Sequence, residues 1–377
     1  MLKLVTDDTT WDEAAFAAAV EGMCDQVEHF PHLTVPFIAH TTPEVVFLFF
    51  ALWKMGKTAF PLSTRLPAPP EPLFVPQMPQ PKNPKYTSWK EGTLATQLYT
   101  SGSTAAPKIA CHTLANHIYS ALGSNTLTPL EKDDRWLLSL PLFHVGGIAI
   151  LFRCYLSGAT AVISSKPTGI THLSLVPTQL LRMGDVSSFK CILLGGAPLP
   201  QNLPSNCKTT YGMTEMSSQI VTDHQILPHT EMKIADDGEI LVRGKTLFHG
   251  YLDEEFDRTA WFPTRDLGRW THDGKFEVLG RKDNMFISGG ENIQPEEIEA
   301  ILKAVPGVEE AVVVPLTDPT FGARPALLMR PLLPLETIHA LLKPHLPKFK
   351  WPIKAELLPL DTPPKINRHS LAHLLIE

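Results

Sequence analysis

"FKCILLGGAPLP", residues 189–200, is the stretch that decides the fold class. Four consecutive apolar residues, Cys191 to Leu194, run into a Gly-Gly pair with no polar residue between them. Such a run is typical of a strand covered on both faces, as the strands of parallel sheets are. A similar run, ATAVIS at 159–164, follows the helix-like stretch GIAILFRCYLSG at 147–158. The alternation of these patterns predicts an α/β fold.

The pattern changes towards the C-terminal end. GEILVRG at 238–244 alternates apolar and polar residues, and 268–281 has the pattern of a hairpin with an Asp-Gly turn. Beyond it, Pro295 and the glutamates after it are typical of a helix start, and two strand-like runs follow. Because 377 residues exceed the size of one hydrophobic core, we expect two domains. The first, at 1–281, is α/β with an antiparallel β module, and the second, at 282–377, is small and α+β.

A proline-rich segment of the first domain is expected to connect regular elements without being a helix or strand itself. Nine of the 35 prolines lie between Pro61 and Pro84, a density that no helix or central strand tolerates. We therefore expect an extended surface connection there. Before it, the apolar run at 45–53 is too short to span a membrane and predicts a buried helix that begins at Pro43.

Composition excludes several classes of function. The formal net charge of −6 gives no electrostatic case for binding nucleic acid or an anionic membrane. The first residues turn acidic before an apolar run forms, so we expect no secretory signal and no membrane insertion. Five scattered cysteines without a C-x-x-C pair favour a reducing cytoplasm over a disulfide framework or a zinc site.

A stretch of small and hydroxylated residues at 99–108, YTSGSTAAPK, allows two interpretations. It follows a strand-like run, and its backbone N–H groups, its hydroxyls and Lys108 could all contact an anion. It is not a P-loop, since the second glycine and the hydroxyl after the lysine are missing. Taken alone, the stretch is as compatible with a polar turn as with a phosphate loop.

Three further stretches carry polar groups suited to a nucleotide. YGMTEMSS at 211–218 has Tyr211 to stack on a ring, and Thr214 and Glu215 to serve phosphate and Mg²⁺. Asp266 suits a ribose diol, and Arg281 could join it. Near the end, Lys365 lies between a proline pair and a polar turn. Each of these residues, taken singly, is better explained as structural, or, for the lysine, as solvated.

In this order, the four stretches resemble the adenylate-forming superfamily, which comprises acyl-CoA and aryl-CoA ligases, luciferases and adenylation domains. The resemblance covers roughly residues 35–375. It implies ATP and CoA as substrates, Mg²⁺ as cofactor and a mobile C-terminal domain. It also implies the following roles: ATP phosphates at Thr100, Ser101, Gly102, Ser103, Thr104 and Lys108; adenine at Gly196, Ala197, Tyr211 and Gly212; phosphate and metal at Thr214 and Glu215; ribose at Asp266 and Arg281; the hinge at Asp283; the CoA arm at Gly289 and Gly290; and completion of adenylation at Lys365.

Three other stretches, at 133–159, 289–299 and 321–329, are similar to one branch of that superfamily, the 2-succinylbenzoate–CoA ligases of menaquinone synthesis. In that branch His144 and Ser218 belong to the acyl pocket. Arg153 would pair with the substrate carboxylate that does not react, because a guanidinium matches carboxylate geometry. The alternative for Arg153 is an arginine on a helix surface.

The resemblance implies an ATP-dependent acid–CoA ligase that acts through an acyl-adenylate. Two alternatives stay open: a ligase for another aryl or acyl acid, and a non-catalytic AMP-binding protein. The oligomeric state is open too, a homo-oligomer included. One departure stands out, since Ala105 occupies a loop position where the superfamily usually has glycine. If that position needs a positive φ, alanine costs about 1 kcal/mol there.

Overall fold

The computed structural model describes residues 2–65, 70–85, 89–100, 108–166, 168–180, 182–196, 203–254, 256–360 and 368–375. The chain divides into two compact units. The first comprises Met1–Met232 and Val242–Phe262, and the second comprises Lys233–Leu241 and Pro263–Glu377.

A largely parallel sheet forms one layer of the first unit, which confirms the predicted α/β class. Its inner strands β9, β10 and β11 are parallel, and the runs at 159–164 and 189–200 contribute β8 and β10, as the pattern predicts. The strand order is β13-β12-β11-β10-β9-β7-β8-β1-β2. The bounds are β1 Lys3–Val5, β2 Thr10–Trp11, β7 Arg135–Leu137, β8 Thr160–Val162, β9 His172–Leu175, β10 Cys191–Leu194, β11 Cys207–Met213, β12 Ser218–Thr222 and β13 Gln225–Ile226.

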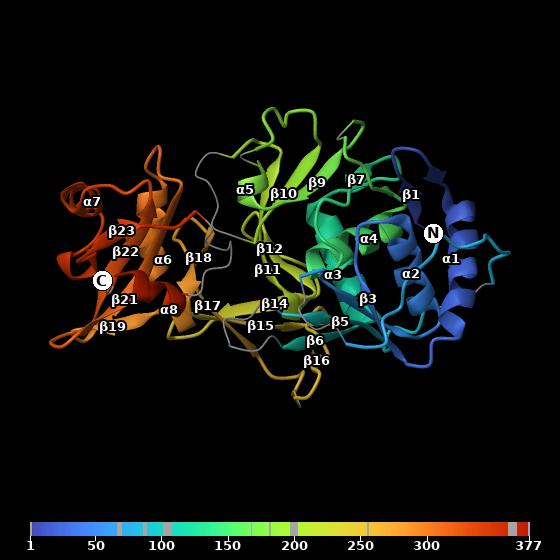
Figure 1. The fold of residues 1–377 in the computed structure, drawn as a ribbon, viewed down its shortest axis with the longest axis horizontal. Helices are drawn as coiled ribbons and strands as arrows, with labels where there is room; N and C mark the ends of the chain where they lie inside the picture. The colour runs from blue at the N-terminus through green and yellow to red at the C-terminus, as the bar shows by residue number, and fades with distance from the viewer. Residues whose placement is uncertain are drawn as a thin grey trace. The chain divides into compact units, whose positions relative to one another are not determined.

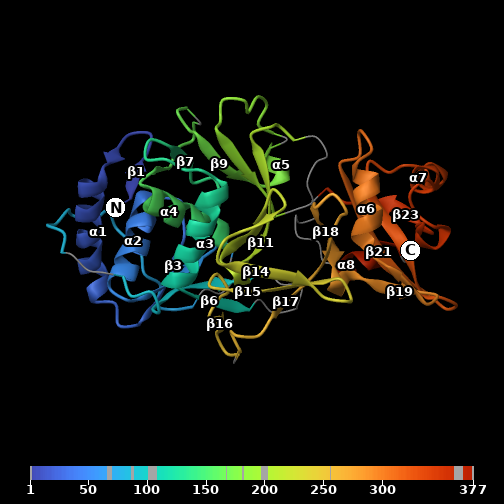
Figure 2. The ribbon, with the colours of Figure 1, turned by 180° about the vertical axis from the view of Figure 1, so that it is seen from behind.

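A second sheet of the same unit has the order β16-β6-β5-β4-β3. Its strands are β3 Thr34–Ile38, β4 Thr58–Leu62, β5 Leu94–Tyr99, β6 Ile109–Thr113 and β16 Gly250–Tyr251. Helices α2 (Pro43–Lys54), α3 (Leu114–Leu127) and α4 (Val145–Ser157) lie between the two sheets (Figures 1 and 2). Helix α1 (Glu13–Glu28) packs on α2, and the short α5 (Pro177–Leu180) follows β9.

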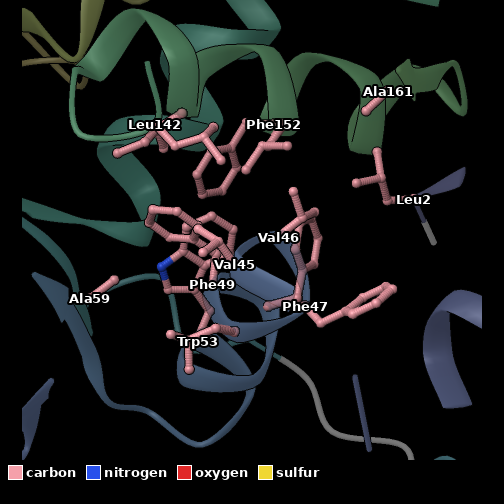
Figure 3. Close-up of a cluster of buried hydrophobic side chains, with 14 of the residues drawn as sticks. Leu2, Val45, Val46, Phe47, Phe49, Trp53, Ala59, Leu142, Phe152 and Ala161 are labelled. Atoms are coloured by element: carbon pink, nitrogen blue, oxygen red, sulfur yellow. The ribbon is translucent and has the colours of Figure 1, made fainter. Parts of the chain in front are cut away.

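The core of this unit is built around α2, whose residues 45–53 are all buried, as predicted. Phe49 and Trp53 of α2 face Phe152 of α4, and the Trp53 and Phe152 rings lie 4.5 Å apart (Figure 3). Burial of large aromatic side chains contributes about 1.5–3 kcal/mol each. This packing fixes α4 against the centre of the unit, which matters because α4 also carries Arg153.

The expectation of an extended connection is confirmed for the described residues 70–85, which form no helix or strand. It is wrong at Pro61, which lies in β4, between β3 and β5. β4 pairs with β5 in parallel at Ala59 and Thr96. Pro61 lies two residues beyond that pair, so its missing N–H interrupts no ladder on that side.

The second unit has the small α+β arrangement expected of the C-terminal part. Helix α6 (Pro295–Lys303) begins at Pro295 and packs on the strand β21 (Glu310–Asp318) of the sheet β21-β22-β23. The other elements are β22 Gly322–Arg330, β23 Ala355–Leu357, α7 Leu335–Leu342, α8 Arg368–Leu371, and the hairpin of β19 Phe286–Ser288 and β20 Glu291–Ile293.

The predicted hairpin at 268–281 is present as β17 (Phe262–Trp270) and β18 (Phe276–Arg281), in the sheet β14-β15-β17-β18. The chain passes between the units three times, within β14 (Thr230–Ile234), within β15 (Glu239–Gly244) and at the start of β17. Residues 263–281 group with the second unit because β18 packs on α6. We expected the domain boundary after residue 281 and a hinge at Asp283, about which the C-terminal domain turns. Both stay predictions.

Candidate active site

Thr100 and Lys108 form the base of the predicted phosphate loop. The Thr100 N–H donates to the Lys108 carbonyl at 2.8 Å, directly beyond the pairing of β5 and β6 at Tyr99 and Ile109. The hairpin of β5 and β6 therefore holds Thr100 and Lys108 together at the end of two buried strands. Ser101, Gly102, Ser103 and Thr104, together with Ala105, lie outside the described residues.

The Lys108 ammonium contacts one residue of β16 and one residue shortly after it. Its Nζ lies 2.6 Å from Oε1 of Glu254 and 4.6 Å from the centre of the Tyr251 ring. Tyr251 reaches this place because β16 pairs with β6, with Tyr251 opposite Ala110. An ammonium with a carboxylate and an aromatic face as partners is held in place without being deeply buried.

Thr214, Glu215 and Met216 form a single 3₁₀ turn between β11 and β12. The turn ends on two residues with positive φ, Ser217 at 57° and Ser218 at 130°. For side chains other than glycine such conformations cost free energy and persist only where surrounding contacts hold them. Here the Ser120 hydroxyl donates to the Ser217 carbonyl at 2.9 Å.

Glu215 is almost buried, and its carboxylate is oriented by the phenol of Tyr251. Tyr251 Oη donates to Glu215 Oε1 at 2.7 Å, and the Phe248 N–H donates to the Glu215 carbonyl at 2.8 Å. Mg²⁺ in nucleotide sites is held by one or two carboxylates together with phosphate oxygens. Among the described residues, no group of three or more His, Cys, Asp or Glu side chains could hold a metal. One oriented carboxylate therefore fits a Mg²⁺ ion that arrives with a nucleotide.

At the predicted adenine site, Gly195 and Gly212 lie so close to neighbouring residues that a side chain would not fit. A Cβ on Gly195 would lie 2.2 Å from Oγ1 of Thr210, and one on Gly212 would lie 1.9 Å from the Ser218 carbonyl oxygen. Gly196 has φ of 80°, which glycine adopts without strain. Tyr211 lies on β11 beside this edge, half-buried, while Ala197 is outside the described residues.

Arg153 is buried, with 2% of its surface exposed, so the interpretation as a helix-surface arginine is wrong. Its Nη2 donates to Gln219 Oε1 at 2.9 Å and to Ser218 Oγ at 3.2 Å. Its guanidinium also lies 5.3 Å from the Trp136 ring, while its Nε is buried without a hydrogen-bond partner among the described residues. No Asp or Glu of the described chain forms an ion pair with it, and burial lowers the pKa of Arg153 to about 10.

His144 caps the start of α4, nine residues before Arg153. Its carbonyl accepts from the Gly147 N–H at 3.0 Å, and its ring lies 4.5 Å from that of Phe143. The side chain is exposed. The structure thus places His144 and Arg153 on one helix, with Ser218 in contact with Arg153.

In the second unit, Asp266 and Arg281 face each other across β17 and β18, as their pairing in the hairpin dictates. Arg281 Nη1 donates to Asp266 Oδ1 at 2.9 Å, and Nη2 donates to Asp283 Oδ2 at 3.0 Å. Arg265, with φ of 63°, donates from Nε to Asp283 Oδ1 at 3.1 Å. The residues predicted for ribose and for the hinge therefore form one charged network.

Gly289 and Gly290 form the turn of the β19–β20 hairpin. Their φ values of 59° and 88° are those of a two-residue turn that favours glycine at both positions. A Cβ on Gly289 would also lie 2.6 Å from the Phe321 ring. Lys365 lies outside the described residues, three positions before Arg368 in the sequence.

Comparison with known proteins places the chain in a family. Residues 68–252 match the model of the AMP-binding enzyme family. The 2-succinylbenzoate–CoA ligase of Escherichia coli strain K12 is 33% identical, over 96% of this chain and 90% of that protein. The chain belongs to the AMP-binding enzyme family.

Solved structures of this family have the same fold. The o-succinylbenzoate–CoA synthetase of Bacillus subtilis in complex with ATP and magnesium ion aligns with a TM-score of 0.83 at 28% identity. That alignment covers 98% of this chain and 96% of the other. The same enzyme with the acyl-adenylate intermediate OSB-AMP aligns with a TM-score of 0.81 at 27% identity, over 98% and 94% of the two chains. No helix among the described residues is long and apolar enough to cross a membrane.

Four residues that contact predicted site residues were not themselves predicted: His112, Gln219, Tyr251 and Glu254. Gln219 follows Ser218 directly, and the run at 211–218 stopped one residue short of it. Tyr251 and Glu254 are far in sequence from Glu215 and Lys108, and only the pairing of β16 with β6 brings them there. No local pattern signals such contacts.

Proposed function

We propose that this chain is an ATP-dependent ligase that joins 2-succinylbenzoate to CoA through an acyl-adenylate, as its relatives' names indicate for them. The observation that carries the choice of acid is Arg153. A buried guanidinium without a carboxylate partner is costly, since burial penalises an uncompensated charge. A substrate carboxylate would compensate it, and 2-succinylbenzoate has one carboxylate to spare when the other reacts.

Arg153 is also held in the right way for this role. Ser218 Oγ and Gln219 Oε1 both accept from Nη2. The N–H groups of Nε and Nη1 are not used by these two residues, and a substrate carboxylate would accept from one of them. Trp136 under the guanidinium fixes its plane. We propose that His144 borders the same acyl pocket from the start of α4.

In the proposed adenylation, the reactive carboxylate attacks the α-phosphorus of ATP, and pyrophosphate leaves. Such a step depends on positioning and on neutralising phosphate charge. We assign phosphate contacts to Lys108, Thr214 and the loop from Thr100 to Thr104. Mg²⁺ beside Glu215 supplies further positive charge when bound. Lys365 would contact the attacking carboxylate and the α-phosphate.

We assign adenine to the glycine-rich edge of β10 and β11, and ribose to Asp266 and Arg281. In the second step, the small domain would turn at Asp283 and bring Gly289 and Gly290 to the pantetheine arm of CoA. Attack by the CoA thiol on the activated carbonyl then gives the thioester and AMP. All five cysteines are free thiols, which supports a cytoplasmic location as part of the proposal.

A substrate panel tests the choice of acid. Pyrophosphate release is measured with 2-succinylbenzoate, benzoate and medium-chain fatty acids, for the natural chain and for Arg153→Gln. We expect kcat/KM for 2-succinylbenzoate to be the highest and to fall about 100-fold in Arg153→Gln, because a buried charge loses its partner. The low turnover of benzoate should stay the same in both proteins.

Equal turnover of all acids by the natural chain would contradict the choice of 2-succinylbenzoate and favour another acid. An equal loss with every acid in Arg153→Gln would instead show that Arg153 only stabilises the fold.

A further inference from the structure

A chain of buried hydrogen bonds ends on the turn that carries Thr214 and Glu215. His112 Nε2 lies 2.7 Å from the Thr214 carbonyl oxygen, and His112 Nδ1 lies 3.3 Å from Thr96 Oγ1. The same Thr96 oxygen lies 2.8 Å from Nε2 of His117. The three side chains come from neighbouring elements, β5, β6 and α3, and are between 0% and 1% exposed.

The atoms at each end fix the direction of the chain. A carbonyl only accepts, so His112 carries its proton on Nε2 and accepts at Nδ1. The Thr96 hydroxyl then donates to His112 Nδ1 and accepts from His117 Nε2–H. His117 Nδ1 consequently carries a lone pair, and it has no hydrogen-bond partner among the described residues. Both imidazoles are neutral in this arrangement, and burial lowers the pKa of His112 to about 4.

Packing holds this chain rigidly. The His117 ring stacks on Phe152 of the central core, with ring centres 5.0 Å apart and planes 11° apart. His112 lies 5.1 Å from His117 and 6.3 Å from Phe248. His112 is therefore fixed relative to α3, which carries His117, and to α4, which carries Phe152.

The turn needs such external support. Ser217 and Ser218, which end it, both have positive φ. Its carbonyls each accept from a different element: Thr214 from His112, Glu215 from the Phe248 N–H and Ser217 from the Ser120 hydroxyl. His112 is the donor to Thr214, the residue that directly precedes Glu215.

We propose that His112, oriented by Thr96 and His117, is a positioning residue that sets the Thr214–Glu215 turn for Mg²⁺ and the ATP phosphates. Because His112 is 0% exposed, we assign it a positioning role and not a contact with substrate. The role in Mg²⁺ binding rests on the proposed function, because it assumes that Glu215 serves a metal held together with ATP.

The test uses four variants of the full chain. His112→Leu fills the buried space with an apolar side chain and removes the donor. His112→Gln keeps an N–H that can reach the carbonyl. Thr96→Val removes the hydroxyl between the histidines at constant shape. His172→Leu is the matched control, because His172 is also 1% exposed and bonds a backbone carbonyl, that of Pro129, through Nε2 at 3.1 Å.

Two readouts are measured: binding of α,β-methylene-ATP by calorimetry as Mg²⁺ is varied, and the KM for Mg²⁺ in adenylate formation. In His112→Leu we expect the Mg²⁺ concentration needed for nucleotide binding and the KM for Mg²⁺ both to rise about tenfold. This is the effect of losing one good hydrogen bond to a fixed carbonyl. Thr96→Val should show a smaller change in the same direction. His112→Gln should recover to within about threefold of the natural chain.

His172→Leu should lose thermal stability like His112→Leu while its Mg²⁺ dependence stays unchanged. The proposal is overturned if both leucine variants change Mg²⁺ dependence alike, or if neither does. Failure of the proposed function is recognised separately: 2-succinylbenzoate would then give no adenylate with the natural chain, while the calorimetric comparison still reports on His112.

Discussion

At the scale of single residues, Lys108, to which we assign an ATP phosphate, is paired with Glu254 in this structure. Glu254 lies 2.6 Å from Lys108 and both side chains are about half exposed. If Lys108 serves phosphates, it has to leave Glu254 when ATP binds. An exposed ion pair contributes roughly 0–1 kcal/mol, so this competition is weak but measurable.

Glu254→Gln should therefore lower the KM for ATP by about twofold to fivefold, with kcat unchanged, and the effect should shrink at high salt. Glu231→Gln is the control, since Glu231 forms an exposed pair with Arg243 in the same unit. Steady-state kinetics at two salt concentrations measure both. A raised KM in Glu254→Gln would show that Glu254 supports Lys108 in its binding position.

The sequence identified candidate site residues by their chemical type, but it did not predict which other residues they contact. Glu215, Asp266 and Arg281 carry the groups that a nucleotide needs, and the pairing of Asp266 with Arg281 was predictable because the hairpin is local. The contact of Tyr251 with Glu215 joins residues 36 positions apart, and that of His112 with Thr214 joins residues 102 apart. Such contacts depend on how strands are ordered in a sheet, which no local pattern encodes.

At the scale of elements, the proline-rich segment at 70–85 packs closely on α1. Gln77 exchanges hydrogen bonds with Gln26, the Lys82 N–H donates to the Ala18 carbonyl, and the Lys85 N–H donates to Glu21. The prediction of an extended segment was correct here because proline excludes the regular alternatives. Its attachment to α1 was not predictable, since most of the contacts join backbone groups of the segment to residues of α1 that are distant in sequence.

Gly22 is the position where this attachment is tightest. A Cβ there would lie 2.0 Å from the Gln80 carbonyl oxygen. Alanine normally stabilises a helix interior relative to glycine by about 1 kcal/mol. Gly22→Ala should instead lower the free energy of unfolding by about 1–3 kcal/mol, because the segment must move.

Urea unfolding measures this change. Gly92→Ala is the control, since a Cβ there would meet no atom within 4 Å, and it should alter stability little. A Gly22→Ala variant as stable as the natural chain would mean that the segment adapts at no cost.

At the scale of the whole molecule, the α/β class followed from the apolar runs because buried parallel strands leave little choice of residue. The division into units was less predictable. The hairpin of β17 and β18 has the pattern of an antiparallel module, but the pattern does not say which core it joins. Packing of β18 on α6 decides that.

Stability of the whole chain should depend on pH through its buried histidines. Burial lowers the pKa of His112 from 6.5 to about 4. The unfolded chain therefore binds a proton that the folded chain excludes, and stability is lost as pH falls from 6.5 to 4. The loss from His112 alone is about 3 kcal/mol.

Urea unfolding between pH 7 and pH 4.5 measures this loss, and His112→Gln should show a shallower fall than the natural chain. Parallel curves for the two proteins would mean that His112 is protonated in the folded state.

The most direct measurement is product formation from 2-succinylbenzoate, ATP, Mg²⁺ and CoA, followed by mass spectrometry. We predict 2-succinylbenzoyl-CoA and AMP in equal amounts, and no thioester when either ATP or Mg²⁺ is left out. Thioester formed only from other acids, or AMP released without any thioester, would contradict the proposed function.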